Sequence, residues 1–263
     1  MRIATWNVNS IRARADRIGA WLDRSDADVL AIQELKCKDS QFPQDLFTDR
    51  GYEVAFHGLN QWNGVAIASR IGLEDVEIGF PEVPGFGDDD EVEARAISAE
   101  CDGVRVYSLY VPNGREVDHP HYHYKLLWLA ALRAEIVRKL ESGENPELVL
   151  CGDFNVAPQD EDVWDMAAFE GATHVSEPER AAFSALLDAG LTDVARPFTP
   201  GPGVYTYWDY QQLRFPKKQG MRIDFQLASA PLADRAVDAF IDREERKGKG
   251  ASDHAPVVVD YRS

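Results

Sequence analysis

Residues 147–158 read ELVLCGDFNVAP, an apolar run that turns polar at Asp153. The run 147–151 predicts a buried strand, and Asp153 and Asn155 follow where that strand ends. In α/β sheets, ligands bind at such strand ends. This stretch therefore predicts both an α/β fold and a polar site at one edge of a sheet.

The rest of the chain alternates β-rich apolar runs with segments of helical periodicity. Helices are expected over 13–24, 122–140 and 178–189, where apolar residues recur every three or four positions. Strands are expected over 2–6, 28–32, 52–56, 64–68, 93–99, 104–111, 223–228 and 256–261, with surface loops over 81–90 and 197–203. No linker or solenoid repeat interrupts this order, so we expect residues 1–263 to form one domain of layered sheets with helices outside.

The composition narrows the class of protein. A chain of 263 residues with 44% hydrophobic and 10% aromatic residues is globular, which excludes disordered and collagen-like classes. The apolar stretch 126–132 is far shorter than the roughly 20 residues of a membrane span, and the N-terminus lacks a signal-peptide core. Three widely spaced cysteines indicate a reducing compartment and no zinc cluster. We therefore expect a cytoplasmic monomer that does not bind membranes.

The charge distribution leaves a nucleic-acid partner open. The chain carries 28 Lys and Arg against 45 Asp and Glu, a net charge of −17, which on average opposes phosphate binding. Local patches decide binding, however. Basic stretches at 211–222, with Lys217, Lys218 and Arg222, and at 243–249 border the polar clusters, and Arg115 follows Asn113. The aromatic run 205–210 precedes the first basic stretch, which suits stacking on DNA. The alternatives are a solvated charged face and ordinary aromatic packing, and we favour packing for Tyr205 and Tyr207.

Other polar clusters, like the one at 152–155, lie at the ends or starts of predicted strands. They are WNVN at 6–9, QELK at 33–36, YVPNG at 110–114, RID at 222–224 and SDHAP at 252–256. Mg²⁺ takes oxygen ligands, typically one or two carboxylates completed by water and substrate phosphate. The clusters supply such a set in Glu34, Asp153 and Asp253 and the amide oxygens of Asn7 and Asn155.

The remaining polar residues suit phosphate chemistry. His254 stands beside one Asp, and another elsewhere could polarise its imidazole. Tyr110 and Asn113 add neutral donors, which completes an inventory for phosphoryl transfer. Each cluster alone could instead be a solvated loop, an Asx turn or a strand cap. The prediction depends on finding all six clusters in this order.

The ordered set resembles the exonuclease III family of abasic-site endonucleases, within the endonuclease/exonuclease/phosphatase superfamily. The resemblance runs from Arg2 to Asp260. GDFN and SDH alone identify only the superfamily, whereas the longer matches indicate the abasic-site branch. The matching stretches are WNVNSIRAR at 6–14, QELK at 33–36, YVPNG at 110–114, GDFNVAP at 152–158, RIDFQLAS at 222–229 and SDHAPV at 252–257.

This resemblance implies a four-layer α/β sandwich of two mixed sheets, the deoxyribonuclease I-like fold, with the site at one edge and the number of metal ions left open. Glu34 would be the main ligand of Mg²⁺, or of Mn²⁺ in its place, with Asn7 beside it and Asp253 as a further ligand. Asp153 and Asn155 would also face the metal, Asp153 orienting or deprotonating the attacking water and Asn155 holding it. Asn9 departs from relatives that carry Asp there, which argues against a second tight metal site.

The resemblance also implies roles around the phosphate. His254, paired with Asp224, would bind the phosphate or act as a base, although Asp224 could instead form a surface ion pair with Arg222. Tyr110 would contact the phosphate or the leaving oxygen, and Asn113 would hold a phosphate oxygen. Trp208 would line the pocket for a baseless deoxyribose.

The activity implied is Mg²⁺-dependent hydrolysis of duplex DNA on the 5′ side of abasic sites, together with trimming of blocked 3′ ends by 3′–5′ exonuclease or 3′-phosphatase action. Two alternatives remain. A sphingomyelinase-like or inositol-phosphate phosphatase would share the metal and His residues but should lack the aromatic and basic stretch around Trp208. A non-catalytic DNA-binding protein on this fold would be expected to lack a catalytic residue.

Overall fold

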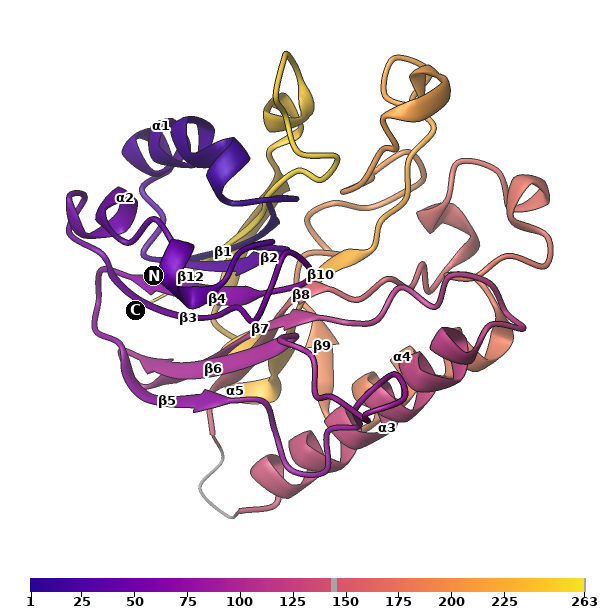
Figure 1. Cartoon of the computed structure of the whole chain (residues 1–263), viewed down its shortest axis with the longest axis horizontal. Coiled ribbons are helices and arrows are strands. Elements are labelled where there is room, and N and C mark those ends of the chain that lie inside the picture. Colours follow the sequence, from indigo (N-terminus) through magenta and orange to yellow (C-terminus); the bar gives the residue numbers. More distant parts are fainter. Residues whose placement is uncertain (143–145, 263) are drawn as a thin grey trace.

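The computed structural model describes residues 1–142 and 146–262, and its strands form two six-stranded sheets (Figure 1). In the first sheet, β1 and β2 are parallel and the other neighbours are antiparallel. Its order is β11 (Ala236–Ile241), β12 (Val257–Tyr261), β1 (Arg2–Asn7), β2 (Val29–Gln33), β4 (Val65–Ser69) and β3 (Glu53–His57).

The second sheet repeats this plan. Its parallel pair is β7 and β8, and the other neighbours are antiparallel. Its order is β5 (Glu74–Ile78), β6 (Ala96–Cys101), β7 (Val104–Tyr110), β8 (Leu148–Asp153), β10 (Asp224–Ser229) and β9 (Leu191–Asp193).

Helices cover the outer face of each sheet, so the fold is a four-layer α/β sandwich, as predicted. Figure 1 shows α1 (Ala15–Ser25) and α2 (Asp45–Thr48) outside the first sheet, and α3 (Pro120–Leu140) and α4 (Glu177–Asp188) outside the second. The short α5 (Ala230–Ala233) follows β10. Short 3-10 helices lie at Arg12–Arg14, Asp39–Gln41, Asp160–Asp162, Met166–Phe169, Gln211–Leu213 and Arg243–Arg246.

Three apolar cores join these layers. The central core lies between the sheets and includes Ile3, Val29, Val106 and Val149. A second core lies under α3 and α4, and a third lies under α1 and α2. Cys101 and Cys151 are buried in the central core, as expected for structural thiols. No helix in the described ranges is long and apolar enough to span a membrane.

The predicted helices and strands exist, with ends that differ by a few residues, but the sequence did not predict β5, β9 or β11. β5 is an edge strand, and every one of its residues is exposed. Its apolar residues are separated by polar ones, so the sequence shows no apolar run there. The strand β11 is also an exposed edge, and β9 has only three residues. The predicted domain range 1–263 includes residues 143–145 and 263, which lie outside the described residues.

The two parallel pairs position the site. Because parallel strands end at the same sheet edge, Asn7 pairs with Gln33 at the end of β1 and β2, and Tyr110 pairs with Asp153 at the end of β7 and β8. Asp224 at the start of β10 pairs with Asp153 as well. The polar ends of both sheets therefore meet at one edge of the sandwich.

Candidate active site

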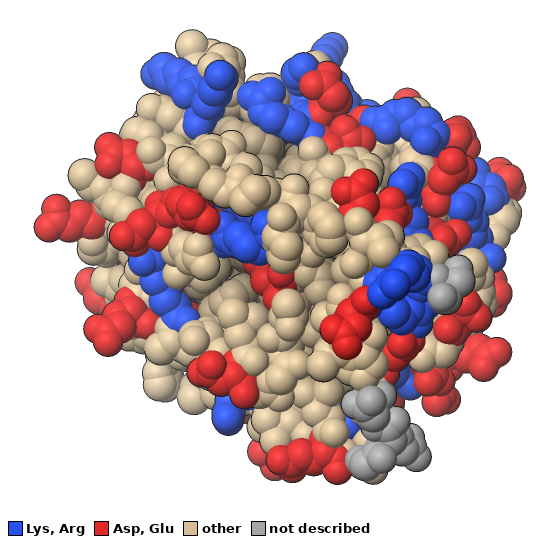
Figure 2. All heavy atoms as spheres, turned by 180° about the vertical axis from the view of Figure 1, so that it is seen from behind, with Lys and Arg blue, Asp and Glu red and all other residues tan. Residues whose placement is uncertain are grey.

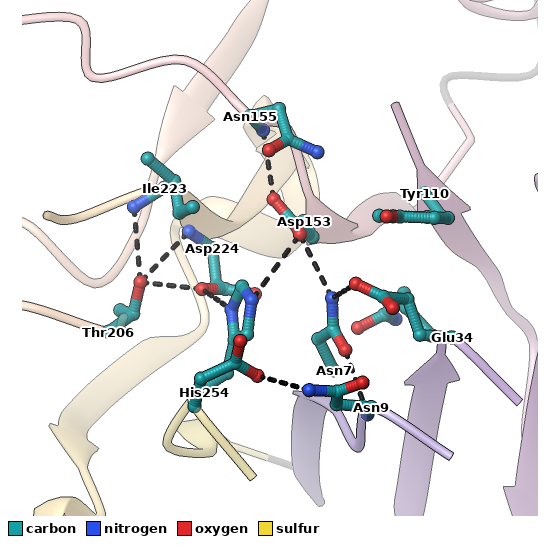
Figure 3. Close-up of polar contacts among 12 residues, drawn as sticks. Asn7, Asn9, Glu34, Tyr110, Asp153, Asn155, Thr206, Ile223, Asp224 and His254 are labelled. Carbon is teal, nitrogen blue, oxygen red and sulfur yellow. Dashed lines mark hydrogen bonds and ion pairs between the residues drawn. The ribbon is translucent and has the colours of Figure 1, made fainter. Parts of the chain in front are cut away.

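Residues from both sheets converge at this edge, as Figure 3 shows. The Asn7 side chain lies between two carboxylates, and its Nδ2 donates to Glu34 Oε1 at 2.9 Å and to Asp153 Oδ2 at 3.0 Å. Its Oδ1 accepts from the Asn9 backbone N–H at 3.0 Å. Asn7 is thus placed as a donor that holds the two carboxylates together, and its role as a metal ligand stays a prediction.

Glu34 follows β2 with a left-handed backbone, at φ 54°. Its Oε2 lies 2.8 Å from Lys36 Nζ, which also donates to Asn9 Oδ1 at 2.5 Å. Burial raises the pKa of Glu34, but the Lys36 ammonium and the hydrogen bonds from Lys36 and Asn7 outweigh burial, so the net pKa is lowered. Glu34 is therefore an ionised carboxylate at neutral pH.

His254 lies between two buried carboxylates. Its Nδ1 is 2.8 Å from Asp224 Oδ2, and its Nε2 is 3.7 Å from Asp153 Oδ2. Burial lowers the pKa of His254, but Asp224 and Asp153 together raise it to about 10. Asp224 also accepts from Thr206 Oγ1 at 2.6 Å, which fixes its orientation. Asp224 is therefore the partner of His254 and not part of a surface ion pair with Arg222.

The surroundings of Asp153 disfavour its ionised form. Burial and the negative charges of Asp224 and Glu34 raise its pKa to about 7, although His254 and the Asn155 backbone N–H oppose this shift. Ligand atoms of Glu34, Asp153 and His254 lie within 4.8 Å of one another. Carboxylates held together in this way suit a hard divalent cation, which would relieve their repulsion.

Asp253 borders the same centre. Its Oδ1 accepts from Asn9 Nδ2 at 3.0 Å, and the residue lines the cavity in front of Glu34 and Asp153. Asn9 therefore connects Asp253 to Lys36 through hydrogen bonds without adding a charge.

Asn155 faces the other side of the cavity. It has a left-handed backbone at φ 50°, and its N–H donates to Asp153 Oδ1 at 2.9 Å. Its Oδ1 accepts from Asn113 Nδ2 at 3.2 Å and lies 3.1 Å from His174 Nε2. The Asn155 amide oxygen thus points to Asn113 and His174, away from Glu34, and does not join the carboxylate group.

One cavity of about 180 Å³ brings the predicted and the unpredicted residues together. Tyr110 lines it, and burial together with the negative charge of Glu34 raises the Tyr110 pKa well above its usual value. Sequence reasoning missed His174, Met221 and Ile223, and it assigned Tyr207 to packing. The cavity is lined by Glu34, Tyr110, Asn113, Asp153, Asn155, His174, Tyr207, Met221, Ile223, Asp253 and His254.

Tyr207 is the aromatic residue at the centre. Its ring lies 4.9 Å from the His254 ring, and it also lines an adjoining cavity of about 250 Å³ with Trp164 and Phe169. Trp208, predicted to line the sugar pocket, is only 1% exposed and packs edge-on against Phe215 at 5.2 Å. The sequence assignment of these two neighbouring aromatic residues is therefore reversed.

The predicted DNA-contacting residues separate into two groups. Arg115, Lys217 and Lys218 are exposed. Arg222 is 1% exposed and binds Asp193 through two hydrogen bonds of 2.7 and 2.9 Å, so its guanidinium is not available to DNA. In the second basic stretch, Arg246 is buried and donates to the Trp208 carbonyl oxygen at 3.0 Å. Figure 2 shows several Lys and Arg side chains along the upper edge of the molecule with some Asp and Glu among them, and charges of both signs mixed on the right flank.

The chain is similar to known nucleases and phosphatases in both sequence and fold. The model of the Endonuclease/Exonuclease/phosphatase family matches residues 4–254. The chain is 31% identical to an exodeoxyribonuclease of Bacillus subtilis (strain 168) over 266 residues, with 98% of each chain covered. A 3′ phosphatase from Neisseria, bound to a product DNA hairpin, has a TM-score of 0.94 at 37% identity over 100% of both chains. An AP endonuclease from Archaeoglobus fulgidus has a TM-score of 0.92 at 36% identity, again over 100% of both chains.

Proposed function

The chain belongs to the endonuclease/exonuclease/phosphatase family and is a hydrolase of the exonuclease III and AP endonuclease type, and from this premise we propose that it is a Mg²⁺-dependent DNA-repair nuclease. It cleaves the phosphodiester on the 5′ side of an abasic site in duplex DNA, leaving a 3′-hydroxyl. The same site removes blocking groups or nucleotides from 3′ ends.

The observation that carries this proposal is the arrangement of Asp153, His254 and Asp224 beside Glu34 in one cavity. Asp153, with its pKa raised to about 7, can accept the proton of an attacking water near neutral pH. His254, held protonated by Asp224, places a positive charge where a phosphate oxygen would bind. Asn113 offers an amide donor to another phosphate oxygen, and the Tyr110 hydroxyl, which stays protonated, offers one to the leaving oxygen.

We assign the metal to Glu34 and Asp153, with Asp253 as the outer carboxylate, because the protonated His254 ring would repel a cation. When bound, a divalent cation would supply positive charge to the phosphate and to the leaving oxygen. Beside Glu34 and Asp253 stand an ammonium and an amide, those of Lys36 and Asn9, and not a further carboxylate, which favours a single ion.

The lining of the cavity supports the choice of substrate. Tyr207, Met221 and Ile223 form its less polar side, where a deoxyribose without its base would lie. The exposed Lys217, Lys218 and Arg115 lie in loops that border the site and would contact DNA phosphates. The likeness to the Neisseria 3′ phosphatase supports the 3′-end activity. We also propose that residues 1–263 act as one domain and that the protein is a monomer in the cytoplasm.

The test uses three labelled duplexes: one with a single abasic analogue, one with a 3′-phosphate and one undamaged. Each is incubated with Mg²⁺, with Mn²⁺ or with chelator. We expect metal-dependent cleavage on the 5′ side of the abasic analogue, release of the 3′-phosphate, and slow loss of nucleotides from the undamaged 3′ end. Cleavage of inositol phosphates or sphingomyelin instead of DNA would overturn the assignment, and DNA binding without any cleavage would favour the non-catalytic alternative.

A further inference from the structure

A buried ion pair lies behind the phosphate side of the cavity. Lys125 on α3 and Glu179 on α4 meet with 2.5 Å between Nζ and Oε1, and both side chains are 0% exposed. Isolated ions are strongly disfavoured in such surroundings, and even a paired one gains little stability over an apolar pair. The contacts that these two side chains make beyond each other therefore matter more than the pair itself.

Every other hydrogen bond of the Lys125 ammonium ends on a loop that carries a site residue. Nζ donates to the backbone oxygen of Asn155 at 2.5 Å and to that of Asn113 at 3.2 Å. With Glu179 as the third acceptor, all three protons of the ammonium are used. Lys125 thus joins the loop after β7 to the loop after β8.

Glu179 joins a third loop to these two. Its Oε1 accepts from Thr173 Oγ1 at 2.5 Å and from the His174 backbone N–H at 2.9 Å, and its Oε2 accepts from Ser176 Oγ at 2.6 Å. Thr173 Oγ1 also lies 3.3 Å from the backbone oxygen of Asn113. The segment before α4 is therefore tied both to Glu179 and to the loop after β7.

The three loops adopt backbone conformations that need support. Asn155, His174 and Arg115 have left-handed backbones at φ 50°, 77° and 61°, a region that non-glycine residues adopt rarely. At Gly114, a Cβ atom would lie 2.7 Å from Thr173 Oγ1 and 3.2 Å from Lys125 Cδ, so the loops pack directly on each other. In this arrangement Asn113 and His174 both reach Asn155 Oδ1.

We propose that Lys125 and Glu179 are positioning residues for hydrolysis, which hold Asn113, Asn155 and His174 at the cavity without touching the substrate. The inference rests on the proposed function, because its kinetic test needs a duplex that the unmodified protein cleaves.

The main test compares Glu179→Gln with Glu135→Gln. Glu135 is a matched control, because its side chain is 1% exposed and paired with Arg138, but it contacts none of the three loops. We expect Glu179→Gln to lower kcat by about 10²-fold, the scale of a small misplacement of catalytic groups. KM should change by less than about threefold, because the exposed basic residues are unchanged. Glu135→Gln should leave kcat within about twofold at a similar loss of Tm.

Two further measurements keep the proposal falsifiable if Glu179→Gln does not fold. Thr173→Val removes one tie with little change of volume, and we expect an intermediate loss of kcat. In Lys125→Met, the backbone amide NMR signals of Asn113, Asn155 and His174 should shift, because the ties from Lys125 Nζ to the Asn155 and Asn113 backbone oxygens are lost.

Equal kcat values for the Glu179 and Glu135 variants, or unchanged NMR signals of the three loops in Lys125→Met, would overturn the proposal. If the unmodified protein cleaves none of the duplexes, the proposed function fails, while the NMR comparison still decides whether the ion pair holds the loops.

Discussion

Two buried groups of charges flank Asn155, and they differ in how their charges are balanced. On one side, Lys125 and Glu179 neutralise each other, and both are fully enclosed. On the other side, Asp153, Asp224 and Glu34 crowd around His254, and the pKa of Asp153 is raised to about 7. The charges of the first group balance without a ligand, whereas a bound cation would reduce the excess negative charge of the second. Charge balance therefore separates the residues proposed to hold the loops from the residues proposed to carry out hydrolysis.

The largest expected effect is that of His254→Ala. Loss of this ring removes the positive charge beside the phosphate and leaves Asp153 and Asp224 facing each other. We expect kcat to fall by about 10³-fold, within the range for acid–base residues. The exposed His123 on α3 provides the control, and His123→Ala should be nearly silent. A loss smaller than that of Glu179→Gln would reverse the comparison between the two charge groups.

The next effect concerns the metal. Glu34→Gln removes an ionised carboxylate from the acid-rich group, so the affinity for Mg²⁺ measured by calorimetry should fall at least about tenfold, or about 1.4 kcal/mol. Glu179→Gln, which removes a carboxylate from the balanced group, should bind Mg²⁺ as tightly as the unmodified protein. Equal losses in both variants would mean that general charge, not the site, determines binding.

The smallest effect is on the pH dependence of stability. Asp153 has a raised pKa, so its stabilising contribution is present at low pH and is lost as pH rises through about 7. His254 also has a raised pKa, so its contribution is present below about 6.5 and is lost as pH rises through about 10. Without metal, Tm should therefore fall by a few degrees from pH 6 to pH 9, and Mg²⁺ should reduce that fall. A Tm that rises from pH 6 to pH 9 would contradict the raised pKa values of Asp153 and His254.

Much of the fold and the site could be predicted from local patterns. The polar ends of β1, β2, β7 and β8 follow apolar strands, and their convergence follows from parallel pairing. The reversal of Tyr207 and Trp208 has a different cause. Both are aromatic residues in an irregular segment that pairs only through isolated bridges, so no strand periodicity decides which ring turns inward.

Long-range partners account for the other differences. Arg222 belongs to a basic stretch, but its partner Asp193 lies in β9, a three-residue strand that has no sequence pattern of its own. His174 is a single His in a loop, and its role depends on contacts with Asn113 and Asn155, which are distant in sequence. Lys125 resembles any Lys on a helix until α4 is packed against it.

The position of β12 has a consequence during protein synthesis. β12 lies between β11 and β1, so the last strand inserts beside the first one. Asp253 and His254 immediately precede β12, and they meet Asn9 and Asp224 only after that insertion. A nascent chain therefore lacks a complete centre until residues 253–261 have been translated and β12 has inserted between β11 and β1.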